Sequence, residues 1–377
     1  MSIRILITGA RSAVALDMAR EFHRAGYEVH MADCSSAFIA RWSNAVHAFH
    51  RHASPVANPD GFTKDIKNLV ANVQPHRVIP TCEEAFHLAK PSLHESLGYL
   101  LFAPDAAQLA LLHNKSRFMA LCEQAGIATP ASHILISQEE VRAFESPQDW
   151  VFKPCYSRFG AHTLIGPTAQ QLARINPTQA MPWLAQQRIH GQEFSFYAVA
   201  QQGRVVCCAS YHSAWRLKGG ASYAFTPAET NVAEAIEIIA TRLANALQLN
   251  GQFSCDLMQD STGKLWPIEC NPRVTSGLHL LCGNGALAQA IMNATPTLAA
   301  TQTRYMLPMM LLHGWGKASW LQSMREGRDV LGVQNDMKPL YGAMLDTCIF
   351  GFNALRRRTT LAQATTADIE WNGEQLT

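Results

Sequence analysis

The first hundred residues alternate between short apolar segments and helical patterns, and this alternation limits the fold more than any other feature of the sequence. The predicted strands cover residues 3–8, 28–32, 78–80 and 99–102. Between the first two strands, residues 13–25 repeat apolar side chains at helical spacing, which is typical of a β-turn-α-β unit. Strands joined by crossover helices pair in parallel. We therefore expect an α/β fold whose first domain spans residues 1–108.

The turn after the first strand raises the question of a dinucleotide site. Gly9 ends the strand, and Asp33 follows the second strand at a position that can bind a ribose. The dinucleotide fingerprint requires two further glycines, for backbone approach and for helix packing, and residues 10–13 supply none. The sequence favours a Rossmann-like domain that holds no nucleotide, and an NAD(P)-dependent oxidoreductase remains the rival interpretation.

A second domain is predicted over residues 109–299. It opens with a charged helix that begins after Asn114 and ends at Gly126. The strands expected after it cover residues 150–153, 194–200, 205–210, 253–258 and 265–270. Gly203 and Gly263 mark turns that make two antiparallel hairpins, and residues 232–247 form a helix between them. Residues 300–377 are less periodic and are expected to form a small accessory unit.

Lys153 ends an apolar strand and leads into a turn over residues 154–160. A lysine on such a strand needs a partner, and Gly160 in the turn allows backbone amides to approach a phosphate closely. We interpret Lys153 as a phosphate-binding residue.

The last hairpin carries three oxygen ligands. Asp256 lies on its first strand, while Glu269 and Asn271 are two residues apart on the second and therefore share a face. Carboxylate and amide oxygens suit Mg²⁺ bound together with ATP phosphates. Arg273 follows two residues later, where it can neutralise a phosphoryl group or hold a carboxylate.

In this order, the segments resemble the ATP-grasp superfamily, in particular carbamoyl phosphate synthetase large subunits, biotin carboxylase and D-alanine-D-alanine ligase. The motifs are Asn114-Lys115, Phe152-Lys153-Pro154, Gly191-Gln192-Glu193-Phe194-Ser195 and Ile268-Glu269-Cys270-Asn271-Pro272-Arg273. The resemblance covers about residues 1–295. It implies a Rossmann-like domain, an ATP-grasp domain of two α+β subdomains, and a small C-terminal extension.

The resemblance also implies residue roles. Lys115 and Lys153 would hold the ATP phosphates, covered by a loop that includes Ser157 and Gly160. The adenine hinge would consist of Gln186, Gln187, Arg188 and Ile189, and Glu193 would bind the ribose. Asp256, Glu269 and Asn271 would bind Mg²⁺ or Mn²⁺, beside a catalytic Arg273. In relatives the segment matching residues 211–220 closes over the acyl phosphate, so Arg216 and Lys218 are further catalytic candidates, although an ordinary surface loop explains them equally well.

Composition excludes several other functions. The 377 residues carry a formal net charge of only +2, so no global basic field attracts nucleic acid or a membrane surface. No segment has the ~18 uninterrupted apolar residues of a membrane span, and we expect a cytoplasmic protein. The ten cysteines form no C-x-x-C pair, and zinc-ligand spacing is missing.

We therefore predict an ATP-dependent ligase that activates a carboxylic acid as an acyl phosphate for attack by an amine, releasing ADP and phosphate. Both partners would be small molecules, and a homodimer is left open. Besides the oxidoreductase, the alternatives are an ATP-grasp phosphotransferase, a carboxylating relative and an ATP-binding protein without turnover.

Overall fold

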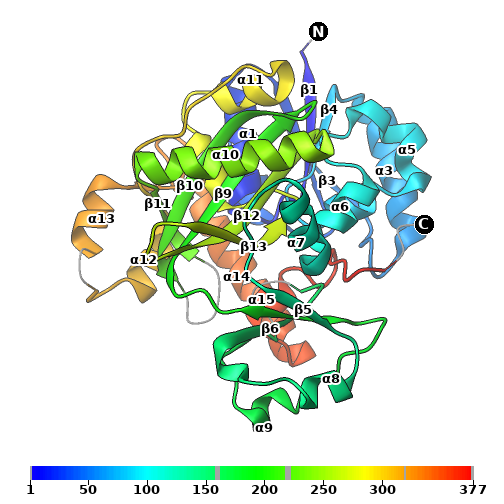
Figure 1. The fold of residues 1–377 in the computed structure, drawn as a ribbon. Helices are drawn as coiled ribbons and strands as arrows, with labels where there is room; N and C mark the ends of the chain where they lie inside the picture. Colours follow the sequence, from blue (N-terminus) through cyan, green and yellow to red (C-terminus); the bar gives the residue numbers. More distant parts are fainter. Residues whose placement is uncertain (1, 158–161, 217–221, 318–319, 375–377) are drawn as a thin grey trace.

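A computed structural model describes residues 2–157, 162–216, 222–317 and 320–374. Within these residues the chain forms three β-sheets, which Figure 1 shows together with the helices that cover them. In the same residues, no helix is both long and apolar enough to cross a membrane.

The first sheet is parallel and has the order β3-β2-β1-β4. Its strands are β1 (Arg4–Thr8), β2 (Glu28–Asp33), β3 (Ala48–Arg51) and β4 (Arg77–Ile79). Helices α1 (Ala13–Arg24), α2 (Phe38–Arg41), α3 (Pro59–Val73), α4 (Glu84–Leu88) and α5 (Pro91–Leu97) accompany it. Residues 5–8 of β1 are fully buried, as expected for the centre of a parallel sheet covered on both faces. The parallel α/β unit expected from the sequence is confirmed.

One predicted strand of this unit is wrong. Residues 98–100 form a short 3₁₀ helix, η1 (Gly98–Leu100), and of residues 99–102 Leu101 alone bridges Val78. The apolar side chains of this segment pack against the first sheet from an irregular backbone, so their hydrophobicity alone suggested a strand.

Two helices lead into the second sheet, which is antiparallel and has the order β5-β8-β6-β7. The helices are α6 (Ala106–His113) and α7 (Lys115–Gln124). The strands are β5 (Ser132–Leu135), β6 (Trp150–Pro154), β7 (Leu164–Ile165) and β8 (Trp183–Gln187), with α8 (Gln138–Arg142), η2 (Pro147–Asp149) and α9 (Ala169–Leu172) between them. Figure 1 places this small sheet at the bottom of the view. It has its own core around Phe152 and Leu135.

The third sheet has the order β13-β12-β9-β10-β11-β14-β15. Its strands are β9 (Gly191–Gln201), β10 (Arg204–Arg216), β11 (Ser222–Pro227), β12 (Gly251–Asp260), β13 (Leu265–Asn271), β14 (Arg304–Tyr305) and β15 (Arg328–Asp329). Alternate residues of β9 enter different cores. Phe196 packs with α10 (Thr230–Leu247), while Tyr197 packs with α1 and η3 (Ser276–Leu281). This large sheet is therefore buried on both faces, and one of its layers is shared with the first unit.

Residues 300–377 pack against both earlier units. They contain α12 (Leu307–His313), α13 (Trp320–Glu326), α14 (Lys338–Arg357) and α15 (Leu361–Ala364), after α11 (Ala286–Asn293). Strands β14 and β15 extend the large sheet. Helix α14 packs on α2, where a Cβ at Gly342 would lie 2.3 Å from the Phe38 carbonyl oxygen. This close approach explains why a glycine stands in the second turn of this long helix.

Candidate functional site

Four charged side chains predicted from separate motifs meet between the small and large sheets. Lys115 is the first residue of α7 and Lys153 lies on β6, while Asp256 and Glu269 lie opposite each other on β12 and β13. The Asn114 side chain caps α7 by accepting hydrogen bonds from the amides of Ser116 and Arg117, both at 3.1 Å. This cap fixes the start of the helix and hence the position of Lys115.

Both lysines are buried, and each ammonium group donates to a backbone carbonyl. Lys115 Nζ donates to Ser157 O at 3.0 Å and lies 3.4 Å from Glu269 Oε2. Lys153 Nζ donates to Ile268 O at 2.8 Å. Burial lowers the pKa of Lys153 to about 8, and the positive charge of Lys115 acts in the same direction against the attraction of Glu269. Two desolvated cations that repel each other suit an anion with several charges, such as a polyphosphate.

The two carboxylates also repel each other. Asp256 accepts from Ser195 Oγ at 2.5 Å and from Asn271 Nδ2 at 3.4 Å. Burial, followed by the negative charge of Glu269, raises the pKa of Asp256 to about 7. Burial opposes ionisation of Glu269 as well, but Lys115 and Lys153 outweigh it and the pKa of Glu269 is lowered.

The repulsion between Asp256 and Glu269 is a reason to ask whether these residues fit a divalent cation. Asp256, Glu269 and Asn271 bring two carboxylates and one amide oxygen together on neighbouring strands, and Mg²⁺ prefers such oxygen ligands. A cation among them would offset the repulsion that now raises the pKa of Asp256. The donor set therefore fits Mg²⁺ or Mn²⁺.

Arg273 connects this cluster to the first unit. Its Nη2 lies 3.5 Å from Glu83 Oε1 and donates to Asn271 Oδ1 at 3.4 Å. Glu83 is buried at the carboxyl end of β4. Its neighbour Glu84 has a structural role, since it accepts from Thr8 Oγ1 at 2.7 Å and from the Thr81 amide at 3.1 Å.

Glu193 and Arg216, which the sequence predicts in separate roles, form a bidentate ion pair. The β9–β10 hairpin pairs Tyr211 with Ser195, so the end of β10 returns to the start of β9. The turn at Gly203 predicts that the two strand ends lie near each other, although Glu193 and Arg216 are not directly opposite in the register. A ribose or acyl phosphate bound here would meet both charges together.

The predicted hinge residues lie at the junction of the small and large sheets. Gln186 is buried on β8, where its Nε2 contacts Met119 Sδ at 3.1 Å. Gln187 is exposed, and the amide of Arg188 donates to Asp149 O at 2.9 Å. Ile189 is half-buried between β8 and β9. Ser157 lies just after β6, while Gly160 and Lys218 lie outside the described residues.

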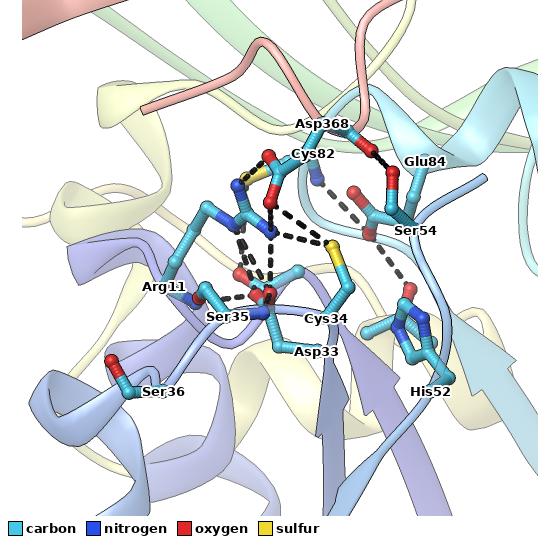
Figure 2. A network of polar contacts seen from close by, with 12 residues as sticks. Arg11, Asp33, Cys34, Ser35, Ser36, His52, Ser54, Cys82, Glu84 and Asp368 are labelled. Carbon is cyan, nitrogen blue, oxygen red and sulfur yellow. Dashed lines mark hydrogen bonds and ion pairs between the residues drawn. The ribbon is translucent and has the colours of Figure 1, made fainter. Parts of the chain in front are cut away.

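The rival nucleotide position, at the carboxyl ends of β1 and β2, is filled by the protein's own charges. Figure 2 shows Arg11 between Asp33 and Asp368. Arg11 Nη2 donates to Asp33 Oδ1 at 2.6 Å, and its Nη1 donates to Asp368 Oδ1 at 2.5 Å. A Cβ at Gly9 would lie 2.7 Å from Glu84 Oε1, so the loop is closely packed. The carboxylate that a ribose would need is therefore committed to an internal arginine.

Comparison with known proteins agrees with this geometry. Residues 112–277 match the family model described as an ATP-grasp domain, and this part of the chain is an ATP-grasp domain. The matched range contains both lysines, the three candidate oxygen ligands and Arg273.

Three solved structures show a similar fold. An L-amino acid ligase from Bacillus licheniformis is 17% identical, with a TM-score of 0.54 over 73% of this chain and 68% of its own. The biotin carboxylase domain of a Hydrogenobacter thermophilus 2-oxoglutarate carboxylase is 14% identical, with a TM-score of 0.62 over 80% of this chain and 74% of its own. A Staphylococcus aureus N5-carboxyaminoimidazole synthetase is 14% identical, with a TM-score of 0.60 over 80% of this chain and 82% of its own. At these identities the likeness shows the fold alone.

Proposed function

We propose that this protein is an ATP-dependent ligase that converts a carboxylic acid into an acyl phosphate, which an amine then attacks. The observation that carries the proposal is the convergence of two buried lysines with Asp256 and Glu269 inside an ATP-grasp domain. The names of the similar structures, an amino acid ligase and a carboxyaminoimidazole synthetase among them, support ligation as the reaction class.

In this proposal the lysines neutralise the ATP phosphates, so that a carboxylate can approach them. Lys115 and Lys153 are held by the carbonyls of Ser157 and Ile268, which orients their charges before ATP binds and reduces the reorganisation needed during reaction. Asp256, Glu269 and Asn271 would hold Mg²⁺, which supplies charge neutralisation at the phosphates when bound.

Arg273 would hold the acid. It lies between the cluster and the first unit, where its guanidinium can bind a carboxylate or the transferring phosphoryl group. A carboxylate oxygen attacks the γ-phosphorus and ADP leaves. The amine nitrogen then attacks the acyl carbon, phosphate departs with the carboxylate oxygen, and the nitrogen loses a proton.

Residues 1–108 would be a Rossmann-like domain that closes the substrate side of the site instead of binding a dinucleotide, residues 109–299 the ATP-grasp domain, and residues 300–377 an accessory region. The structure of the similar biotin carboxylase domain is of a dimer. We extend the proposal to a homodimer, which light scattering would test.

Oxygen-18 transfer tests the reaction. Acids labelled in the carboxylate are screened in pairs with amines for ADP release, and the released phosphate is analysed by mass spectrometry. The proposal expects one oxygen-18 per phosphate, and bicarbonate as the productive acid would make the enzyme a carboxylating relative. ADP with unlabelled phosphate, or phosphate attached to a hydroxyl, would show a hydrolase or kinase and overturn ligation.

A further inference from the structure

A cluster of histidines with one glutamate lies at the amino ends of β2 and β3, away from the strand ends that face the ATP-grasp domain. The candidate ligands are Glu28 and His30 on β2 and His47 just before β3. One ligand atom from each residue lies within 4.8 Å of the other two. Glu28 Oε1 is 3.0 Å from His30 Nε2 and 4.0 Å from His47 Nε2.

The backbone holds these side chains in place before any ligand binds. Glu28 and His30 are two residues apart on a strand, so they share a face. The His47 amide donates to Val29 O at 2.8 Å, which fixes the segment entering β3 against β2. The His30 side chain is 10% exposed, while that of His47 is 61% exposed. The cluster is therefore rigid on one side and open to solvent on the other.

A fourth residue orients the central histidine. His30 Nδ1 lies 3.0 Å from His50 Nε2, and the two rings are stacked with an angle of 16° between their planes. A hydrogen bond at Nδ1 leaves Nε2 directed at Glu28. Histidines that bind metals recurrently use the second ring nitrogen in this way, because the bond fixes the tautomer and the ring orientation.

Without a metal, Glu28 is held by other groups. Arg4 Nε lies 3.1 Å from its Oε1, and Ser2 Oγ donates to its Oε2 at 2.6 Å. Arg4 Nη1 also donates to Val73 O at 3.1 Å and its side chain is 40% exposed, so Arg4 keeps a partner and can move away from Glu28 when a cation replaces it. A divalent ion would contact the carboxylate and both imidazoles at once, which Arg4 cannot do.

We propose that Glu28, His30 and His47 bind a transition-metal ion of the Zn²⁺ class, with His50 as the positioning residue for His30. Two imidazoles and a carboxylate suit Zn²⁺ and its neighbours better than Mg²⁺, and solvent completes the coordination. The ion joins β2 to the segment before β3, a four-residue edge strand. Its role is structural, since the site lies at the opposite strand ends from Gly9 and Asp33.

Metal-free full-length protein titrated with Zn²⁺ against a chromophoric chelator, in the absence of ATP, tests the site. One equivalent should bind, and Co²⁺ in its place should give the intense visible absorption of a four-coordinate site. His47→Ala should weaken binding at least tenfold without affecting folding, because this side chain is exposed. His50→Ala should weaken it roughly tenfold, the lower range for an outer-shell partner.

His76→Ala is the matched control, since it removes another exposed histidine of the first unit and should leave binding unchanged. Zn²⁺ should also raise the melting temperature of the wild type and not that of His47→Ala. Substoichiometric binding, or equal affinity in the wild type and His47→Ala with native circular dichroism spectra, would overturn the proposal and leave the cluster as a hydrogen-bonded surface network.

Discussion

Two buried charge clusters in this molecule differ in how their charges are balanced. At the carboxyl ends of β1 and β2, Arg11 lies between Asp33 and Asp368, so each neighbour of the cation is an anion. In the ATP-grasp domain, Lys115 lies near Lys153 and Asp256 lies opposite Glu269, so like charges are neighbours. A buried cluster whose opposite charges are paired needs no ligand to balance it, whereas repulsion between like charges can be offset by a ligand that carries both signs of charge, such as a metal nucleotide.

The pKa shifts show the same contrast. Burial would lower the pKa of Arg11, but Asp33 and Asp368 outweigh it and raise that pKa. The pKa of Asp33 is likewise lowered by Arg11 in spite of burial. Both residues are thus held in their charged forms. Lys153 and Asp256 are shifted toward their neutral forms instead, so the second cluster is destabilised until a ligand arrives.

The largest expected effect is on turnover. Glu269→Ala should lower kcat by about 10³-fold or more, and Lys153→Ala should weaken nucleotide binding together with turnover, because each removes charge directed at the transferring phosphoryl group. Both variants should keep the wild-type circular dichroism spectrum. Lys67→Ala, an exposed lysine of α3, serves as the control. Near-normal ADP release from Glu269→Ala would mean that the site has been misplaced.

Substitutions in the cluster of Arg11, Asp33 and Asp368 should change folding stability and leave nucleotide binding unchanged. Asp33→Asn keeps the shape of the side chain but breaks a buried ion pair, which costs about 3 kcal/mol of unfolding free energy. Urea unfolding measures this loss, and MgATP affinity measured in parallel should be unchanged. A variant with wild-type stability and reduced nucleotide affinity would reverse the assignments of the two clusters.

A pH series should separate the clusters further. Asp256, with a pKa of about 7, must lose its proton to bind a cation, so MgATP affinity should rise about fivefold between pH 6 and pH 8, where Lys153 is already partly deprotonated. Above pH 8, deprotonation of Lys153, whose pKa is about 8, should lower it again. Asp256→Asn should remove the rise at low pH, and a rise that persists in this variant would assign it to another group.

The effect of Asp256 on folding stability has the opposite pH dependence to its effect on MgATP affinity. The raised pKa means that folded Asp256 keeps a proton that the unfolded chain, with an ordinary carboxyl pKa near ~3.9, has lost. This residue therefore makes the metal-free protein less stable as pH rises from about 4 to about 7. Urea midpoints of the wild type and Asp256→Asn across this range measure the contribution.

The smallest effect is expected at Asp368. The Asp368 side chain is 28% exposed, and Arg11 would still be paired with Asp33 if Asp368 were removed. Asp368→Ala should therefore lower the free energy of unfolding by about 1 kcal/mol, near the range of a partly exposed ion pair. The comparison with Asp33→Asn, measured by the same urea unfolding, shows which carboxylate dominates. If Asp368→Ala loses as much free energy of unfolding as Asp33→Asn, the ion pair between Arg11 and the C-terminal segment is as important for stability as the pair with Asp33.

Local pattern was enough to predict the elements that carry the ATP-grasp site. Turn glycines at 203 and 263 predicted two hairpins that the structure confirms, and period-two alternation placed the candidate oxygen ligands Glu269 and Asn271 on one face. The Arg11–Asp368 contact joins residues 357 positions apart, and no local signal encodes it. The same holds for β14 and β15, whose two-residue strands join the large sheet only through tertiary packing.

The histidine cluster shows a different reason for a missed site. His30 lies on β2 and His47 lies just before the neighbouring parallel strand β3, and their proximity depends on the pairing of His30 with Ala48. A search for regular ligand spacing cannot detect such a site, because the intervening segment is an ordinary crossover.

Titration calorimetry of ATP, with Mg²⁺ and with excess chelator, tests the central assignment most directly. Lys115, Lys153 and the opposed carboxylates can accommodate nucleotide charge only when a cation separates the phosphates from Asp256 and Glu269. ATP should therefore bind with one-to-one stoichiometry in Mg²⁺ or Mn²⁺, and at least tenfold more weakly with chelator. Equal affinity in both conditions, or no measurable binding in Mg²⁺, would contradict the assignment of this cluster as the MgATP site.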